Sequence, residues 1–90
     1  MLNFSLILVE PRDAAHSEEL VQLAEDYRSL VADEAARLRR TIMDEYHTAE
    51  DDRLEELDKL RKAAEHWEGV FKSLLTQARL GAFYEIKKVS

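Results

Sequence analysis

The sequence predicts a mainly α-helical fold with a small sheet (α+β), in the order strand, long helix, long helix, strand. Residues 12–68 contain neither glycine nor proline. Apolar side chains recur there at steps of three and four residues, with charges between them, which is the period of an amphipathic helix. Short runs of β-favouring residues flank this region at 2–9 and 82–89, and they predict the two strands.

The first strand and the start of the first helix follow from local residue types. In residues 2–9, Phe4, Leu6 and Leu8 alternate with the other side chains, as on the two faces of a strand. Pro11 should end that strand. Asp13 or Ser17 should then cap the helix, because a short polar side chain can accept a hydrogen bond from the first free N–H groups.

Each predicted helix has one apolar stripe. We expect the first helix at 18–46, with a stripe that follows an eleven-residue repeat: Leu20, Ala24, Tyr27, Val31, Ala35, Leu38, Ile42 and Tyr46. The second, at 49–80, has a heptad stripe: Leu57, Leu60, Ala64, Trp67, Phe71, Leu74 and Ala78. Gly81 should end the second helix, because glycine readily adopts the left-handed conformation found after a helix.

The break between the helices carries the weakest local signal. Residues 48–51 have the form of a capping box, Thr48 followed three residues later by Asp51. We therefore expect a turn between Tyr46 and Asp51, near His47, that folds the helices into a hairpin. One continuous helix that pairs with a second chain is the alternative. A hairpin would bring the two terminal strands together as an antiparallel pair, with residues 1–90 forming a single domain.

Such a hairpin would leave apolar surface and strand edges open, which favours self-association. We expect a homodimer or higher oligomer built as a four-helix bundle with a shared small sheet. The candidate core and oligomer residues lie where the apolar stripes are broad: Tyr27, Val31, Trp67, Val70, Phe71 and Leu74.

Composition limits the possible settings and partners. The net charge of −6 argues against direct nucleic-acid binding, which needs a positive surface. The chain has no cysteine, so disulfides and thiolate zinc sites are excluded. We see no apolar segment long enough to span a membrane and no signal peptide, and we expect a cytoplasmic protein.

No motif for catalysis, metal binding or cofactor binding stands out, so we predict no enzyme activity, no metal and no cofactor. The one basic cluster is Arg37, Arg39 and Arg40, with Arg53 nearby across a hairpin. These arginines are the candidate partner-binding residues, because guanidinium groups bind acidic or phosphate groups well. The competing interpretation is ordinary pairing with acids one helical turn away.

The sequence therefore predicts a non-enzymatic protein–protein interaction module that acts as a homo-oligomer and binds an unidentified protein. Two alternatives stay open. One is a small acidic inhibitor, of the kind that viruses and mobile elements encode, acting on a nucleic-acid-binding protein. The other is a binder of a small molecule or peptide at the aromatic strand end, around Tyr27, Trp67, Phe71 and Tyr84.

Overall fold

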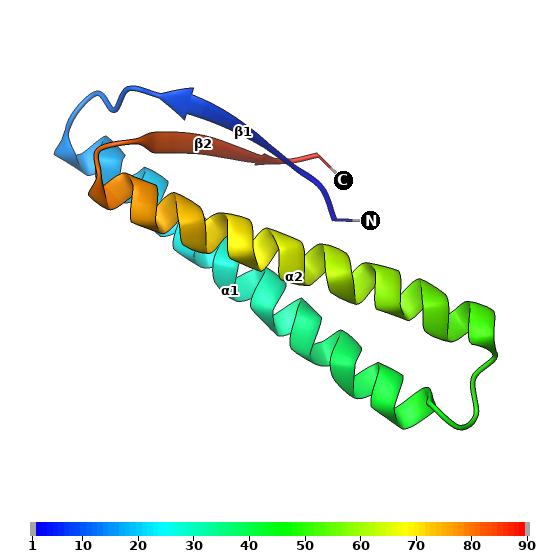
Figure 1. Ribbon diagram of the computed structural model, residues 1–90. Helices are drawn as coiled ribbons and strands as arrows, with labels where there is room; N and C mark the ends of the chain where they lie inside the picture. The colour runs from blue at the N-terminus through cyan, green and yellow to red at the C-terminus, as the bar shows by residue number, and fades with distance from the viewer. Residues whose placement is uncertain (1, 90) are drawn as a thin grey trace.

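The computed structural model describes residues 2–89 and has the predicted order of elements. They are β1 (Phe4–Val9), α1 (Ala14–Glu45), α2 (Asp51–Arg79) and β2 (Phe83–Lys88). Figure 1 shows the two long helices side by side, with the two strands above their open end. The chain measures 53 × 18 × 16 Å along its principal axes. The mainly helical fold with a small antiparallel sheet is confirmed.

The turn lies where the sequence predicts it, and the chain forms a hairpin instead of one continuous helix (Figure 1). The Glu45 carbonyl accepts hydrogen bonds from the N–H groups of Thr48 and Ala49 at 3.1 and 2.8 Å. The predicted Thr48 capping box is wrong, because α2 begins two residues later than expected and its N-cap is Glu50. Glu50 makes no side-chain cap bond. The negative charges of Asp51 and Asp52 in the first turn stabilise the positive end of the helix dipole instead.

The two helix termini next to the sheet, the start of α1 and the end of α2, are both capped. Asp13, one of the two predicted caps, accepts a hydrogen bond from the His16 N–H at 2.8 Å, so α1 starts earlier than expected. The Arg12 N–H donates to His16 Nδ1 at 3.0 Å. At the end of α2, Gly81 has φ +92°, and its N–H donates to the Ala78 carbonyl at 3.1 Å. Leu80 is the C-cap, and Gly81 is the left-handed glycine that follows it, as predicted.

The two strands pair antiparallel along their full length, from Phe4 opposite Lys88 to Val9 opposite Phe83. Strand β2 lies closer to the helices than β1 does (Figure 1). Its Cα atoms come within 8 Å of Cα atoms in both helices, whereas no helix Cα atom lies that close to one in β1. Strand β1 is therefore the outer strand of the sheet.

An aromatic cluster joins the sheet to the helices. The ring centroid of Phe4 lies 5.0 Å from those of Tyr27, Trp67 and Phe71, edge to face in each case. Edge-to-face pairs at this distance have favourable quadrupole geometry. Beyond the sheet, the helices pack against each other through buried alanine and leucine side chains, among them Ala35, Leu38 and Ala64. The buried apolar residues are Phe4, Leu20, Ala24, Val31, Ala35, Leu38, Leu57, Ala64, Phe71, Leu74 and Ile86.

Candidate interaction surfaces

Two of the arginines predicted as partner-binding residues lie on different sides of α1. Arg37 pairs with Glu34 one turn earlier, and Arg39 pairs with Glu65 of α2 at 2.8 Å. Positions two residues apart on a helix differ by about 200° around its axis, so Arg37 and Arg39 do not share a face. Both guanidinium groups already have a carboxylate partner within the chain.

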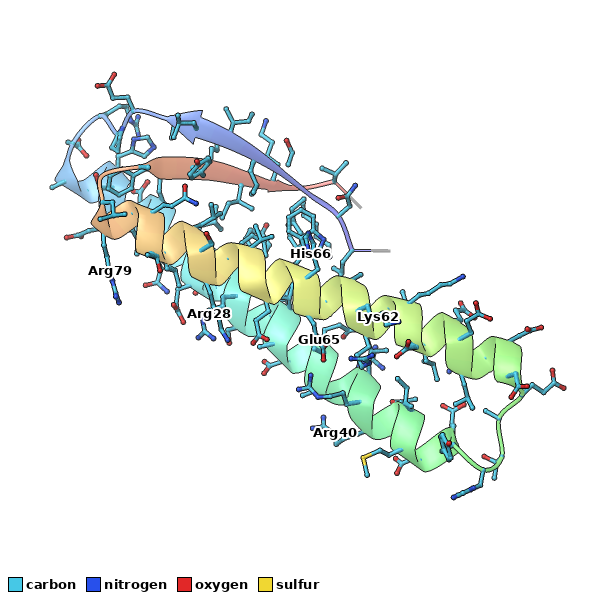
Figure 2. The ribbon with its side chains drawn as sticks, in the orientation of Figure 1. Arg28, Arg40, Lys62, Glu65, His66 and Arg79 are labelled. Atoms are coloured by element: carbon cyan, nitrogen blue, oxygen red, sulfur yellow. The ribbon has the colours of Figure 1, made fainter. Side chains whose placement is uncertain are left out.

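The other two arginines lie near the turn. Arg53 pairs with Glu45 across the two helix ends, at 3.3 Å. For Arg40 no ion pair is found within residues 2–89. Figure 2 shows Arg40 on the side of the hairpin away from the sheet. The four arginines are thus spread around the turn-proximal half of the hairpin, and only Arg40 lacks an acidic partner there.

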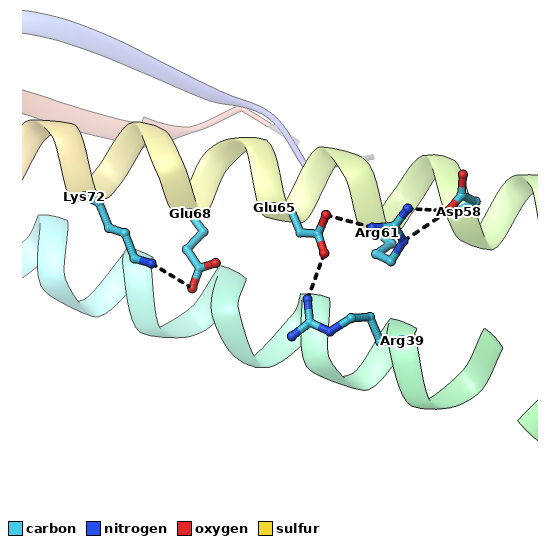
Figure 3. Close-up of polar contacts among 6 residues, drawn as sticks. All are labelled: Arg39, Asp58, Arg61, Glu65, Glu68 and Lys72. Carbon is cyan, nitrogen blue, oxygen red and sulfur yellow. Dashed lines mark hydrogen bonds and ion pairs between the residues drawn. The ribbon is translucent and has the colours of Figure 1, made fainter. Parts of the chain in front are cut away.

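The most connected polar group is a chain of ion pairs between the two helices (Figure 3). Glu65 accepts from Arg39 of α1 and from Arg61 of its own helix, both at 2.8 Å. Arg61 also donates to Asp58 at 2.6 Å, and Asp58 pairs with Lys62 at 3.1 Å. Among the ion pairs drawn in Figure 3, the one between Glu65 and Arg39 links α2 to α1.

These contacts shift the acidity of two carboxyl groups. Partial burial raises the pKa of Glu65, but the hydrogen bonds from Arg39 and Arg61 outweigh it and hold that pKa below its usual value. The hydrogen bonds from Arg61 and Lys62 likewise lower the pKa of Asp58. Both carboxylates are therefore charged throughout the neutral range, and they neutralise the arginines beside them.

We call the side of the hairpin opposite the sheet the polar helix face, formed by Arg28, Arg39, Asp58, Arg61, Glu65, Glu68 and Lys72. Figure 2 shows Arg28 and Glu65 on this side and His66 on the sheet side. Arg28 also bonds to Glu25, and Lys72 lies 3.9 Å from Glu68. Charges of both signs alternate along this face, so it presents no field of one sign to a partner.

The predicted core and oligomer residues lie at the sheet end of the hairpin. Val31 and Phe71 are fully buried, and Leu74 is 7% exposed. Tyr27, Trp67 and Val70 are half-buried and pack against the same core. These six side chains line the contact between α1, α2 and the sheet of a single protomer, so they do not form an open apolar surface.

The aromatic strand end, predicted as an alternative ligand site, is filled by the protein's own side chains. The ring of Phe4 occupies the space between Tyr27, Trp67 and Phe71. The small recess beside Tyr84 measures only about 10 Å³, which is about the room that one water molecule needs. The described residues leave no pocket here that would hold a small molecule.

Acidic side chains gather near the start of each helix, at 10–26 and at 50–58. Because α1 and α2 run antiparallel, these two groups lie at opposite ends of the 53 Å long molecule. The acidic surface is therefore divided in two, with the mixed charges of the polar helix face between its parts. A continuous acidic face, as a nucleic-acid mimic would need, is not formed by the described helices.

Several large apolar side chains stay exposed: Ile7, Leu8, Leu30, Met43, Tyr46, Leu80 and Val89. Two of them are neighbours in β1, where Ile7 is 49% and Leu8 is 64% exposed. The alternation places Leu8 on the same face as Phe4 and Leu6, but the helices do not cover that face at the Leu8 end of the strand. Beside it, a shallow hollow is lined by Leu8, Val9, Glu10, Pro11, Gly81 and Ala82.

The charge pattern of the two strands is a sequence signal for this exposed surface. Residues 2–9 include no charged side chain, whereas the six residues of β2 include Glu85, Lys87 and Lys88. Natural edge strands commonly carry charges that discourage pairing with another chain. The outer strand of this sheet lacks that protection.

No known protein family matches the chain, and no characterised protein or solved structure matches it either. Neither α1 nor α2 has an apolar stretch long enough to span a membrane. Within residues 2–89, no three His, Asp or Glu side chains are grouped in a way that could hold a metal ion.

Proposed function

We propose that this protein is a non-enzymatic protein–protein interaction module that acts as a homodimer. The observation that carries this proposal is the outer strand β1, which is uncharged and exposes two large apolar side chains, Ile7 and Leu8. A two-stranded sheet is marginal in water on its own. Its outer edge gains stability when it pairs with another strand.

The surface area of the protomer also supports association. The accessible surface is 6171 Å², whereas a compact monomer of 10.5 kDa exposes about 5,400 Å². The excess reflects the elongated shape. The sheet covers only one end of the hairpin, and the other end consists of two helices with most of their surface exposed to solvent. A partner that covers part of this surface would bring the buried fraction closer to that of a stable domain.

Two protomers could meet in two ways. The four-helix bundle predicted from the sequence would join helix surfaces, including the exposed Leu30 and Met43, which are 48% and 77% exposed. If it used the polar helix face, it would have to desolvate the ion pairs around Glu65, which is costly. The other arrangement joins the outer strands. It requires no charge to be buried, and we favour it for that reason.

The proposed setting is the cytoplasm, where a chain without cysteine loses nothing by being in a reducing compartment. Homodimers commonly present each surface twice, so a further protein partner would meet two identical faces. The arginines on the turn-proximal half stay candidates for that contact, with Arg40 the one that has no acidic partner among the described residues.

Co-purification of two differently tagged copies tests the proposal. One copy carries an affinity tag, the other a second epitope, and both are expressed in the same cell. If equally expressed copies pair at random, we expect the affinity-purified sample to contain the second copy at about half the amount of the first. An unrelated helical hairpin with the same two tags serves as the control for tag-driven capture. Recovery of the affinity-tagged copy alone would contradict self-association.

A further inference from the structure

The hydrogen-bond pattern of the sheet identifies which backbone groups of β1 are free. The Val89 N–H donates to the Asn3 carbonyl at 2.8 Å, so Asn3 and Val89 form a hydrogen-bonded pair. Such pairs alternate with non-hydrogen-bonded pairs along an antiparallel ladder. The N–H and C=O groups of Phe4, Leu6 and Leu8 therefore point away from β2, and we call these groups the β1 edge.

One group of the β1 edge is already occupied. The Phe4 N–H donates to the Asn3 side-chain oxygen at 3.1 Å, which fits its outward direction. For Leu6 and Leu8, no backbone hydrogen bond outside the β1–β2 ladder is found in residues 2–89. Free backbone groups of this kind, in a strand without charge, are a template for another strand.

We propose that the β1 edge pairs antiparallel with the β1 edge of a second copy of this chain, with Ile7 opposite Ile7 at the two-fold axis. This inference rests on the proposed homodimer and specifies its contact surface. The product is a four-stranded sheet in the order β2, β1, β1, β2. Leu6 of each copy then lies opposite Leu8 of the other, and Ser5 opposite Val9.

This register uses the groups that are free. The Leu6–Leu8 pairs form between residues whose N–H and C=O groups point outward, so they can exchange hydrogen bonds across the new contact. The Ile7 pair is then non-hydrogen-bonded, the type in which opposite side chains lie closest. The hydrogen bond between Phe4 and Asn3 can stay in place, and both exposed side chains, Ile7 and Leu8, gain an apolar neighbour.

The chemistry of the two edges favours a second copy as the occupant and limits assembly to a dimer. Two β1 strands bring no charge opposite another charge, because residues 2–9 have none. In the four-stranded sheet the two edge strands are both β2. Their charged residues Glu85, Lys87 and Lys88 discourage further pairing. The helices do not block the approach, because β2 lies nearer to them than β1 does.

Disulfide formation from single cysteines tests the register, because the natural chain has none. In Ile7→Cys, the two Cα atoms would lie ~4.5 Å apart, within the range that a disulfide needs. We expect a covalent dimer under mild oxidation. Ser5→Cys alone should not cross-link, since those two residues lie ~14 Å apart along the strands. A mixture of Ser5→Cys and Val9→Cys should cross-link to each other.

A charge at the two-fold axis tests the same contact without oxidation. In Ile7→Lys, two like charges would lie opposite each other, which destabilises the pairing, while the exposed position and the neighbouring Glu85 should keep the protomer folded. We expect the mass by light scattering to fall to 10.5 kDa. Met43→Lys, at an exposed apolar residue of α1, is the matched control and should stay dimeric.

The outcomes separate the two proposals. If the natural protein is dimeric, Ile7→Cys cross-links and Ile7→Lys is monomeric, the β1 contact is supported. If the natural protein is dimeric but Ile7→Cys does not cross-link and Ile7→Lys stays dimeric, the β1 contact is overturned and the homodimer stands. If the natural protein is monomeric at all concentrations tested, the homodimer fails together with the contact.

Discussion

The ring of Phe4 in β1 meets the ring of Phe71 in α2 edge to face, with their centroids 5.0 Å apart. These residues come from opposite parts of the chain, and their contact holds the outer strand against the helical hairpin. Phe71 is fully buried and Phe4 is 6% exposed. Strand β1 therefore contacts the helices at its Phe4 end, while Leu8 at its other end is exposed.

Phe71→Ala should strongly destabilise the protein. The change removes a fully buried ring that contacts Phe4, Tyr27 and Trp67, and such truncations cost about 3–5 kcal/mol. Urea unfolding followed by circular dichroism measures the loss. Leu30→Ala is the control, because that side chain is 48% exposed and should change the free energy of unfolding by less than about 1 kcal/mol. Similar losses in both variants would contradict the core described here.

Phe4→Ala should loosen the attachment of β1 to the helices and leave the helices in place. Trp67 is the only tryptophan, and its ring centroid lies 5.0 Å from that of Phe4. We expect its fluorescence to shift to longer wavelength as water reaches the ring, while helical circular dichroism stays nearly unchanged. Ile7→Ala, on the same strand but exposed, should leave the emission as it is. Unchanged emission in Phe4→Ala would show that the strand is held elsewhere.

The helices and strands could be predicted from the sequence because their signals are local. The apolar stripes, Asp13 and Gly81 each act within a few residues, so they predict the hairpin without knowledge of its contacts. The start of α2 could not be predicted from its local motif, the Thr48 capping box. Its motif is present, but the turn backbone continues to Glu50, and the acids at Asp51 and Asp52 act on the helix dipole without a cap bond.

The interaction surfaces were harder to predict because they depend on what covers each side chain. Leu8 alternates with Phe4 and Leu6 as a core residue should, yet only the three-dimensional position of β1 shows that the helices leave it exposed. Similarly, Arg39 resembles a free cation in the sequence. Its partner Glu65 lies 26 residues away and meets it only because the helices are antiparallel.

Acid should weaken the fold through the ion pairs of the polar helix face. The pKa of Glu65 and that of Asp58 are lowered in the folded state. Their contribution to stability is therefore complete above the usual pKa values of 4.5 and 3.8 and is lost as the pH falls through the lower, folded-state values. Thermal unfolding at a fixed protein concentration should show a midpoint that falls below about pH 4.5.

The double variant Glu65→Gln with Asp58→Asn is the control for this acid effect. It lacks both titrating groups, so its midpoint should fall less steeply with decreasing pH than that of the natural protein. The effect should be modest, because both carboxylates are about one-third exposed and solvent screens their pairs. An equal slope in both proteins would show that these pairs do not contribute to the acid response.

Replacing Arg37, Arg39 and Arg40 together with glutamine should change stability little. Two ion pairs are lost, to Glu34 and to Glu65, and exposed pairs contribute about 0.2–1 kcal/mol each. The triple variant should stay folded and dimeric by circular dichroism and light scattering. If a protein partner binds the turn-proximal half, the variant should bind it more weakly, and more so at low salt. Unaltered binding would remove these arginines as partner-binding residues.

Sedimentation equilibrium tests the central claim most directly, because it measures the mass of the unmodified protein in solution. At tens of micromolar, a concentration that detects contacts with micromolar dissociation constants, we expect twice the protomer mass of 10.5 kDa. Dilution should lower the apparent mass towards that of one protomer. A mass of 10.5 kDa at every concentration would contradict the homodimer and the contact between the outer strands.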